Sequence, residues 1–153
     1  MKNVRSVLAT ILLGSVCHGL FAADYYCAPG ANGSGTESDP GDVISAVKKI
    51  GAGETIYLKE GVYKFSSTIL IEEENSGTAG KLKTIKPVEG AEVVLDFSGQ
   101  SAGASNRGFV LDGDYWHFYG FTITNAGDNG MLLSGSNNII EMMVFDDNED
   151  TGL

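Results

Sequence analysis

The sequence predicts an all-β fold, a right-handed parallel β-helix with about 22 residues per coil and a short capping helix at its N-terminal end. The main observation is an internal repeat: Gly108, Gly130 and Gly152 stand 22 residues apart without a gap. Short apolar strands separated by Gly and Asn surround these glycines. Such a period is typical of a solenoid, because a single coil cannot bury its own inner face.

The residues around the glycines keep the same spacing, and size and polarity recur with it. Apolar residues pair with apolar residues, glycine with glycine, and acid with acid: Phe109 with Met131 and Leu153, Val110 with Leu132, Leu111 with Leu133, Gly113 with Gly135, Phe118 with Ile140, Phe121 with Met143, Ile123 with Phe145, and Asp128 with Asp150. Equivalent residues should therefore stack in ladders between coils about 4.8 Å apart. We expect the coil that starts at Gly152 to be incomplete at Leu153, so that the predicted β-helix is C-terminally incomplete.

Residues 1–22 read as a secretory signal peptide, which predicts a secreted, extracellular protein. Lys2 and Arg5 precede an apolar run over 7–16, and the run is too short to span a bilayer. We expect cleavage after Ala22 and no membrane attachment afterwards. A lipoprotein with its lipid on Cys17 is the less favoured alternative, because Gly14-Ser15-Val16 is a poor lead-in to a lipidated cysteine.

The chain that remains after cleavage is strongly acidic. It holds 8 basic and 20 acidic residues, because the leader removes Lys2 and Arg5 from the ten basic residues of the whole chain. Nucleic acid is therefore an unsuitable partner, since phosphate binding rests on clustered Lys and Arg. Cys27 is the one cysteine after Ala22. Its thiol is either buried, reactive, or paired with a cysteine outside this sequence, and without a nearby His a structural role is favoured.

Residues 23–53 are expected to form an N-terminal strand, a loop and the capping helix. Asp24-Tyr25-Tyr26-Cys27 suggests an edge strand, and a segment rich in Gly, Ser and Asn follows it. Asp39 is the predicted N-cap of the helix, with Pro40 in the first turn. The apolar residues Val43, Val47 and Ile50 recur at helical spacing, and Gly51 and Gly53 end the helix.

Residues 54–153 are expected to form the first coils of the β-helix. Strands are predicted near 54–58, 60–63, 68–71, 84–85 and 93–95, with a polar loop inserted over 98–106 before the regular coils. Within the coils, Phe121 and Ile123 should point inward and Thr122 and Thr124 outward, because side chains alternate along a strand. Asn residues suit the corners, since Asn tolerates a left-handed backbone: Asn125, Asn129, Asn137, Asn138 and Asn148.

Two stretches carry a resemblance to a known family. Residues 55–63 read Thr-Ile-Tyr-Leu-Lys-Glu-Gly-Val-Tyr, and residues 113–120 read Gly-Asp-Tyr-Trp-His-Phe-Tyr-Gly, followed by Asn125-Ala126-Gly127, Gly135-Ser136 and Asn148. Together they resemble the N-terminal half of family 9 pectate lyases, the exopolygalacturonate-lyase group with a pectin-lyase-like β-helix. The resemblance extends over 25–153 and is most specific after Arg107.

The resemblance implies a polysaccharide lyase that cleaves polygalacturonate in pectin by calcium-dependent β-elimination. In that family the calcium-binding aspartates and the lysine base follow the segment that matches 148–153, so calcium is expected for a full-length member and no catalytic residue is assigned here. The lysines after residue 22 lie in the cap and first coils instead. We therefore expect an inactive N-terminal fragment. The alternative is a non-catalytic carbohydrate-binding or surface-attachment β-helix protein.

One pair of acidic residues could hold a metal ion. Asp128 and Asp150 are one repeat apart, so their carboxylates could share calcium across two coils. Solvated turn residues are the favoured interpretation, because two acids supply fewer oxygen ligands than the six to eight that calcium takes.

The aromatic cluster over 115–119 could stack on sugar rings. If Phe118 faces inward, Trp116 does so as well, with a buried acceptor for its indole N–H. His117 and Tyr119 then face outward. Trp116 is thus expected in the core, and the outward pair on the surface.

Overall fold

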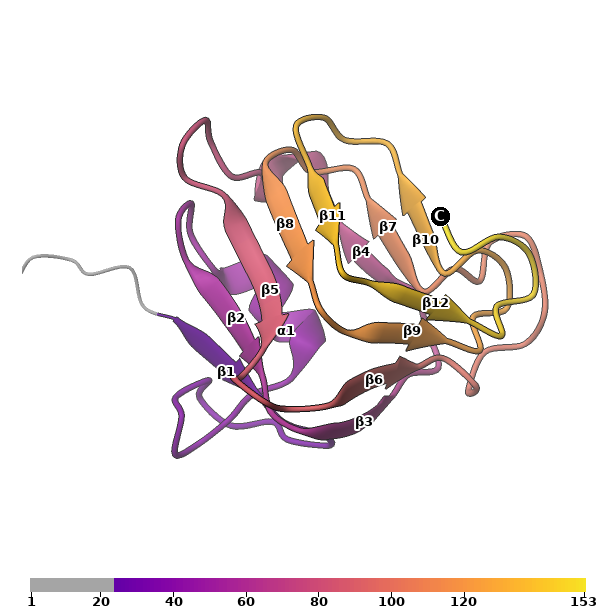
Figure 1. Cartoon of the computed structure of the whole chain (residues 1–153), viewed down its shortest axis with the longest axis horizontal. Helices are drawn as coiled ribbons and strands as arrows, with labels where there is room; N and C mark the ends of the chain where they lie inside the picture. The colour runs from indigo at the N-terminus through magenta and orange to yellow at the C-terminus, as the bar shows by residue number, and fades with distance from the viewer. Residues whose placement is uncertain (1–23) are drawn as a thin grey trace, which may run out of the picture.

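The computed structural model describes residues 24–153, and its strands wind into a parallel β-helix with three sheet faces (Figure 1). The predicted leader and Cys17 lie outside the described residues. The first sheet, sheet A, has the order β1 (Tyr25–Cys27), β2 (Thr55–Leu58), β5 (Lys83–Pro87), β8 (Trp116–Tyr119) and β11 (Ile139–Glu141). Sheet B has the order β12 (Val144–Asp146), β9 (Thr122–Thr124), β6 (Val93–Asp96) and β3 (Gly61–Lys64). Sheet C has the order β10 (Met131–Leu133), β7 (Phe109–Leu111) and β4 (Ile69–Ile71).

The ladder between the last two coils has the register that the repeat predicts. Phe109 pairs with Met131, Phe118 with Ile140, and Ile123 with Phe145, each pair in parallel strands. Earlier coils are longer than the predicted period. Val110 pairs backward with Leu70, because the loop over 98–106 is inserted between their strands. The period of 22 residues thus describes the last two coils and not the first ones.

The capping helix α1 (Val43–Lys49) begins later than predicted. Its N-cap is Asp42, whose side chain accepts a hydrogen bond from Ser45 N at 2.7 Å, so the prediction of Asp39 is wrong. Gly41 forms a parallel bridge with Cys27, which keeps this segment extended and delays the first helical turn. Asp39 instead accepts from Ser34 N at 2.8 Å and fastens the preceding loop.

The helix closes the solenoid as predicted. Its residues Val43, Ala46 and Val47 are buried, and it contacts β1, β2 and β4. An amphipathic helix at this position covers apolar side chains of the first coil that no preceding coil could cover. No helix among residues 24–153 is long and apolar enough to cross a membrane.

The core consists of the inward-facing residues of all three sheets. Phe121 and Ile123 are buried while Thr122 and Thr124 remain partly exposed, which confirms the predicted alternation. Trp116 is fully buried, and its Nε1–H donates at 3.0 Å to the carbonyl oxygen of Asn75, the last residue of the short 3₁₀ helix η1 (Glu73–Asn75). The repeat mates in the last coil are partly buried and pack on this core: Ile140, Met143 and Phe145.

Each regular coil has three corners with a left-handed backbone, and the corners stack. Tyr115 lies below Asn137, Gly120 below Met142, and Asn125 below Asp147, all with positive φ. The prediction for Asn125 and Asn137 is therefore confirmed.

The other three predicted corner residues, Asn129, Asn138 and Asn148, have no positive φ. Asn138 and Asn148 bond the preceding coil instead. The Oδ1 of Asn138 accepts from Trp116 N at 2.7 Å, and the Oδ1 of Asn148 accepts from Ala126 N at 3.0 Å. Their amide groups thus hold successive coils together.

Candidate functional site

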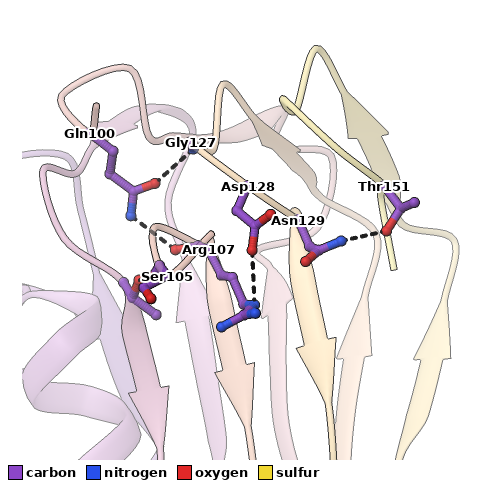
Figure 2. A network of polar contacts seen from close by, with 8 residues as sticks. Gln100, Ser105, Arg107, Gly127, Asp128, Asn129 and Thr151 are labelled. Atoms are coloured by element: carbon purple, nitrogen blue, oxygen red, sulfur yellow. Dashed lines mark hydrogen bonds and ion pairs between the residues drawn. The ribbon is translucent and has the colours of Figure 1, made fainter. Parts of the chain in front are cut away.

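A polar network lies where the chain passes from sheet B to sheet C (Figure 2). Its centre is a column of three residues, Arg107, Asn129 and Thr151, each directly before one of the repeated glycines. Asn129 Nδ2 donates to Thr151 Oγ1 at 2.5 Å, so neighbouring coils are joined side chain to side chain. Because the column follows the repeat, its side chains form a row along the axis of the solenoid.

Arg107 is paired with Asp128 from the next coil. Arg107 Nε lies 3.2 Å from Asp128 Oδ2, and the two side chains are 26% and 13% exposed. The buried Nε has no hydrogen bond of good geometry, so the contact is an ion pair only. The two Nη groups are not among the buried atoms that lack a partner, and no residue of 24–153 forms a hydrogen bond with them. They therefore reach the surface and are available to a ligand.

The backbone of Arg107 is fixed by the inserted loop. Gln100 Nε2 donates to Arg107 O at 2.9 Å, and Gln100 Oε1 accepts from Gly127 N at 3.1 Å (Figure 2). One amide thus ties the loop to both the strand that follows it and the turn of the next coil. The insertion holds the arginine in place.

The structure stacks Asp128 and Asp150 but does not turn them into a calcium site by themselves. Asp150 N donates to Asp128 O at 3.3 Å, so the two residues are neighbours in successive coils, as the repeat predicts. The carboxylate of Asp128 faces Arg107 instead of a second acid. Two carboxylates, one of them already paired with a cation, do not fit the oxygen-rich ligand set of calcium. The calcium ladder stays a prediction.

A second acidic region was not recognised in the sequence. Glu72, Glu73, Glu74, Asp112 and Asp114 line one open groove near the turns after β4 and β7. They are distant along the chain, and the coils bring them together. Among residues 24–153, no group of three or more His, Cys, Asp or Glu side chains is placed to hold a metal ion. The groove is an acidic surface of the protein.

Another ion pair crosses sheet B. The carboxylate of the buried Asp96 forms a hydrogen-bonded ion pair with Lys64 and accepts from Ser98 N at 2.8 Å and from Asn125 Nδ2 at 3.1 Å. Burial by itself would raise the pKa of Asp96, but the hydrogen bonds from Lys64, Ser98 and Asn125 outweigh it and hold the pKa far below its usual range. This carboxylate joins three coils.

The outer face of sheet A carries the outward aromatic residues. His117 and Tyr119 lie on this face as predicted, and His117 Nε2 is 3.0 Å from Glu141 Oε2. Tyr26 and Tyr57 stack there with ring centroids 5.1 Å apart, and Lys86 Nζ lies 5.2 Å from the centre of the Tyr57 ring. These two tyrosines belong to irregular coils, so no repeat in the sequence predicts them.

Cys27 is fully buried, and burial raises the pKa of its thiol to about 12. A thiol with this pKa holds almost no thiolate at neutral pH, so the structural interpretation of Cys27 is favoured over a nucleophilic one.

These observations define a class of protein: a parallel β-helix with a helical N-terminal cap, stacked corners and a row of polar side chains along its axis. The family model for the Pel9A-like right-handed β-helix region matches residues 25–153. The chain belongs to this family, and the right-handed β-helix predicted from the sequence is confirmed.

Curated relatives carry the names of pectate lyases. The chain is 46% identical to pectate lyase L of Paenibacillus polymyxa over an alignment of 136 residues, and this alignment covers 88% of this chain and 30% of that protein. It is 34% identical to pectate lyase L of Thermoclostridium stercorarium, over 79% of this chain and 10% of that protein. With pectate lyase L of Dickeya dadantii it is 32% identical, over 100% of this chain and 38% of that protein. The chain therefore spans well under half the length of these relatives.

Two solved structures show the same fold. Pectate lyase Pel9A matches with a TM-score of 0.75 and 33% identity, over 84% of this chain and 34% of that chain. A rhamnogalacturonan lyase matches with a TM-score of 0.70 but 17% identity, which shows the β-helix alone.

Proposed function

We propose that the chain forms the first coils of a secreted polysaccharide lyase that cleaves polygalacturonate, the acidic chain of pectin, by calcium-dependent β-elimination. The observation that carries the proposal is the 46% identity to a pectate lyase L over 136 residues. The family match over 25–153 supports it, because it includes both the cap and every described coil.

The chemistry of the reaction explains why calcium belongs to the proposal. A calcium ion neutralises the uronate carboxylate beside the C5 proton, which makes that proton easier for a base to remove. The described residues do not assemble a calcium ligand set, so no catalytic role is assigned to any of them. Their proposed contribution is the scaffold and the contacts with the polysaccharide.

A direct assay tests the proposal. Polygalacturonate is incubated with the protein and calcium, and the unsaturated product is followed by its ultraviolet absorbance, with a chelator in a parallel reaction. We expect product to form in the presence of calcium when the protein carries the family's aspartate cluster and lysine, and no product with chelator. Product that forms equally well with chelator would contradict the calcium dependence.

The same assay on the 153-residue chain tests whether this chain is active by itself. Product from this chain would contradict the expectation that none of its residues is catalytic. Methyl-esterified pectin serves as the matched substrate, because its neutral units lack the carboxylate that calcium neutralises.

The competing function is a non-catalytic carbohydrate-binding or surface-attachment protein. The outer face of sheet A favours it, because Tyr26, Tyr57 and Tyr119 place aromatic rings on the surface of one sheet. This alternative predicts binding to polysaccharide without product. Replacement of Tyr57 and Tyr119 by Ala would abolish that binding, whereas the lyase proposal assigns these tyrosines no part in catalysis.

Secretion belongs to the same proposal and rests on residues 1–22. Expression of the whole chain, followed by mass measurement of the exported protein, tests it. A mass that corresponds to a chain starting at Ala23 supports cleavage after Ala22, and retention of the full mass inside the cell contradicts it.

A further inference from the structure

We infer that Arg107 binds the carboxylate of a uronic-acid unit, and that Asn129 and Thr151 bind hydroxyl groups of the same polysaccharide chain. The inference deepens the proposed function and rests on it for the class of ligand. It adds to the chain a polysaccharide-binding row, made of Arg107, Asn129 and Thr151.

The guanidinium group of Arg107 is held in place, and its outer edge is unpaired among residues 24–153. Arg107 is held from two sides, by Gln100 on its backbone carbonyl and by Asp128 on Nε. Its side chain is 26% exposed, while both Nη groups have no hydrogen-bond partner among residues 24–153. An arginine that is fixed at its inner edge and unpaired at its outer edge has already lost much of the conformational freedom that binding would cost.

The outer edge of the guanidinium group suits a carboxylate. A planar guanidinium presents parallel N–H groups that match the two oxygens of a carboxylate, and such charge-assisted pairs are short and strong. Among residues 24–153, Asp128 is the one acid that forms an ion pair with Arg107, and it contacts Nε, which leaves the outer edge for a second carboxylate. Polygalacturonate offers one carboxylate on every sugar unit, whereas a neutral polysaccharide offers none.

The polysaccharide-binding row runs along the axis of the solenoid. Arg107, Asn129 and Thr151 follow the repeat, so successive members lie one coil apart along the solenoid axis, about 4.8 Å. Asn129 Nδ2 donates to Thr151 Oγ1, which leaves the Asn129 carbonyl and the Thr151 hydroxyl hydrogen for a ligand. A carboxylate-binding group followed by amide and hydroxyl groups suits a uronate polymer that runs along the axis.

The neighbouring surface of sheet C agrees with a sugar ligand. On its outer face, Leu70, Val110 and Leu132 lie opposite one another in register, and Leu70 and Leu132 are 39% and 37% exposed. A row of exposed aliphatic side chains can pack against the C–H faces of sugar rings, while the polar row contacts their substituents. The polar row starts at Arg107, two residues before β7, and β7 carries Val110 of the aliphatic row.

Binding measurements test the inference. An oligogalacturonate and the same oligomer in its methyl-esterified form are titrated into the protein by calorimetry, with chelator present to remove calcium-mediated binding. We expect the wild-type chain to bind the uronate oligomer more tightly than the ester. Arg107→Gln should weaken uronate binding about tenfold or more and leave ester binding unchanged, because one bidentate charge-assisted contact is lost.

Two further variants separate the guanidinium from charge in general. Lys48→Gln removes the same charge from an exposed position on α1 and should change neither affinity. Arg107→Lys keeps the positive charge beside Asp128 but lacks the fork, so it should lose most of the uronate affinity. It also serves if Arg107→Gln fails to fold, which the fluorescence of the buried Trp116 reports.

The outcomes are distinct. If the wild-type chain binds the two oligomers equally, or if Arg107→Gln and Arg107→Lys bind uronate as the wild type does, the inference is wrong. In that case the proposed lyase function can still stand, because it is judged by the unsaturated product. Weakened binding in Lys48→Gln to the same extent as in Arg107→Gln would also overturn the inference, since it would show an unspecific effect of charge.

Discussion

Replacement of Gly108 by Ala should destabilise the protein far more than replacement of a glycine in an open turn. Gly108 begins the repeated motif, and a Cβ built on it would lie 2.4 Å from Gly130 O in the next coil. That carbonyl cannot move away freely, because it accepts the hydrogen bond from Phe109 N at 3.0 Å. The Cβ would also come within 3.0 Å of Ile123 Cγ2. The coils would have to separate locally.

The magnitude follows from the contacts that this separation breaks. Overpacking of a closed site costs about 1–3 kcal/mol. Two inter-coil hydrogen bonds, from Gly108 N to Asn129 O and from Phe109 N to Gly130 O, would lengthen. Each contributes about 0.5–1.5 kcal/mol. We therefore expect Gly108→Ala to lower the free energy of unfolding by about 4 kcal/mol, the middle of this range.

Gly90→Ala is the matched control. Gly90 has a φ of +78° but nothing within 4 Å of its Cβ position, so alanine there brings backbone strain without a clash. Its expected cost is about 1 kcal/mol. Urea unfolding can be followed by the emission of Trp116, the one tryptophan of the chain, which is fully buried. Equal losses of stability in the two variants would refute the argument that close coil stacking requires Gly108.

Three more predictions concern a corner, an ion pair and a thiol. Met142→Gly should raise stability by up to about 1 kcal/mol in the same urea assay, because Met142 has a φ of 55° and is 72% exposed, and the preceding coil has Gly120 there; a destabilised variant would contradict this. Because the pKa of Asp96 is lowered in the folded protein, its carboxylate stabilises the fold fully above the ordinary pKa of about 3.9, and this stabilisation is lost as the pH falls toward the folded-state pKa. Asp96→Asn should therefore lower the free energy of unfolding by about 2 kcal/mol at neutral pH, and the stabilities of variant and wild type should converge in acid. Parallel stability curves would disprove it. In a Cys17→Ser background the thiol of Cys27, with its pKa raised to about 12, should not react with a thiol reagent at pH 8 until urea unfolds the chain, and rapid labelling of the folded protein would show otherwise.

The regular coils could be predicted because their period is visible in a single chain. Phe109, Phe118 and Ile123 have the predicted partners, and Trp116 lies in the core as the alternation required. These results depend on local periodicity alone. A side chain that repeats with the coil must face its equivalent, whatever else the chain does.

The start of the helix could not be predicted in the same way. Asp39 and Asp42 both have the side chain that an N-cap requires, and Pro40 suits a first helical turn. The bridge between Gly41 and Cys27 decided between them by keeping that segment extended. This contact joins residues that no local pattern connects.

The candidate site shows the same division. The spacing of Arg107, Asn129 and Thr151 is readable in the sequence, since each residue precedes a repeated glycine. The metal-site prediction fell on Asp128 and Asp150 instead, because carboxylates are ligands for calcium. The partner of Asp128 became clear from the corner geometry, which turns its carboxylate toward Arg107.

The amino-acid sequence by itself determined the architecture of this protein: its parallel coils, the inward and outward faces of the regular strands, and its family. Repetition carries that information, because stacked coils need equivalent residues at equal spacing. The tertiary structure alone decided which side chains meet at the corners and across irregular coils, such as Asp96 with Lys64 and Tyr26 with Tyr57. Those contacts depend on loop lengths that differ from coil to coil. Where loop lengths differ, equivalent residues are not equally spaced, so the sequence shows no period that predicts which of them meet.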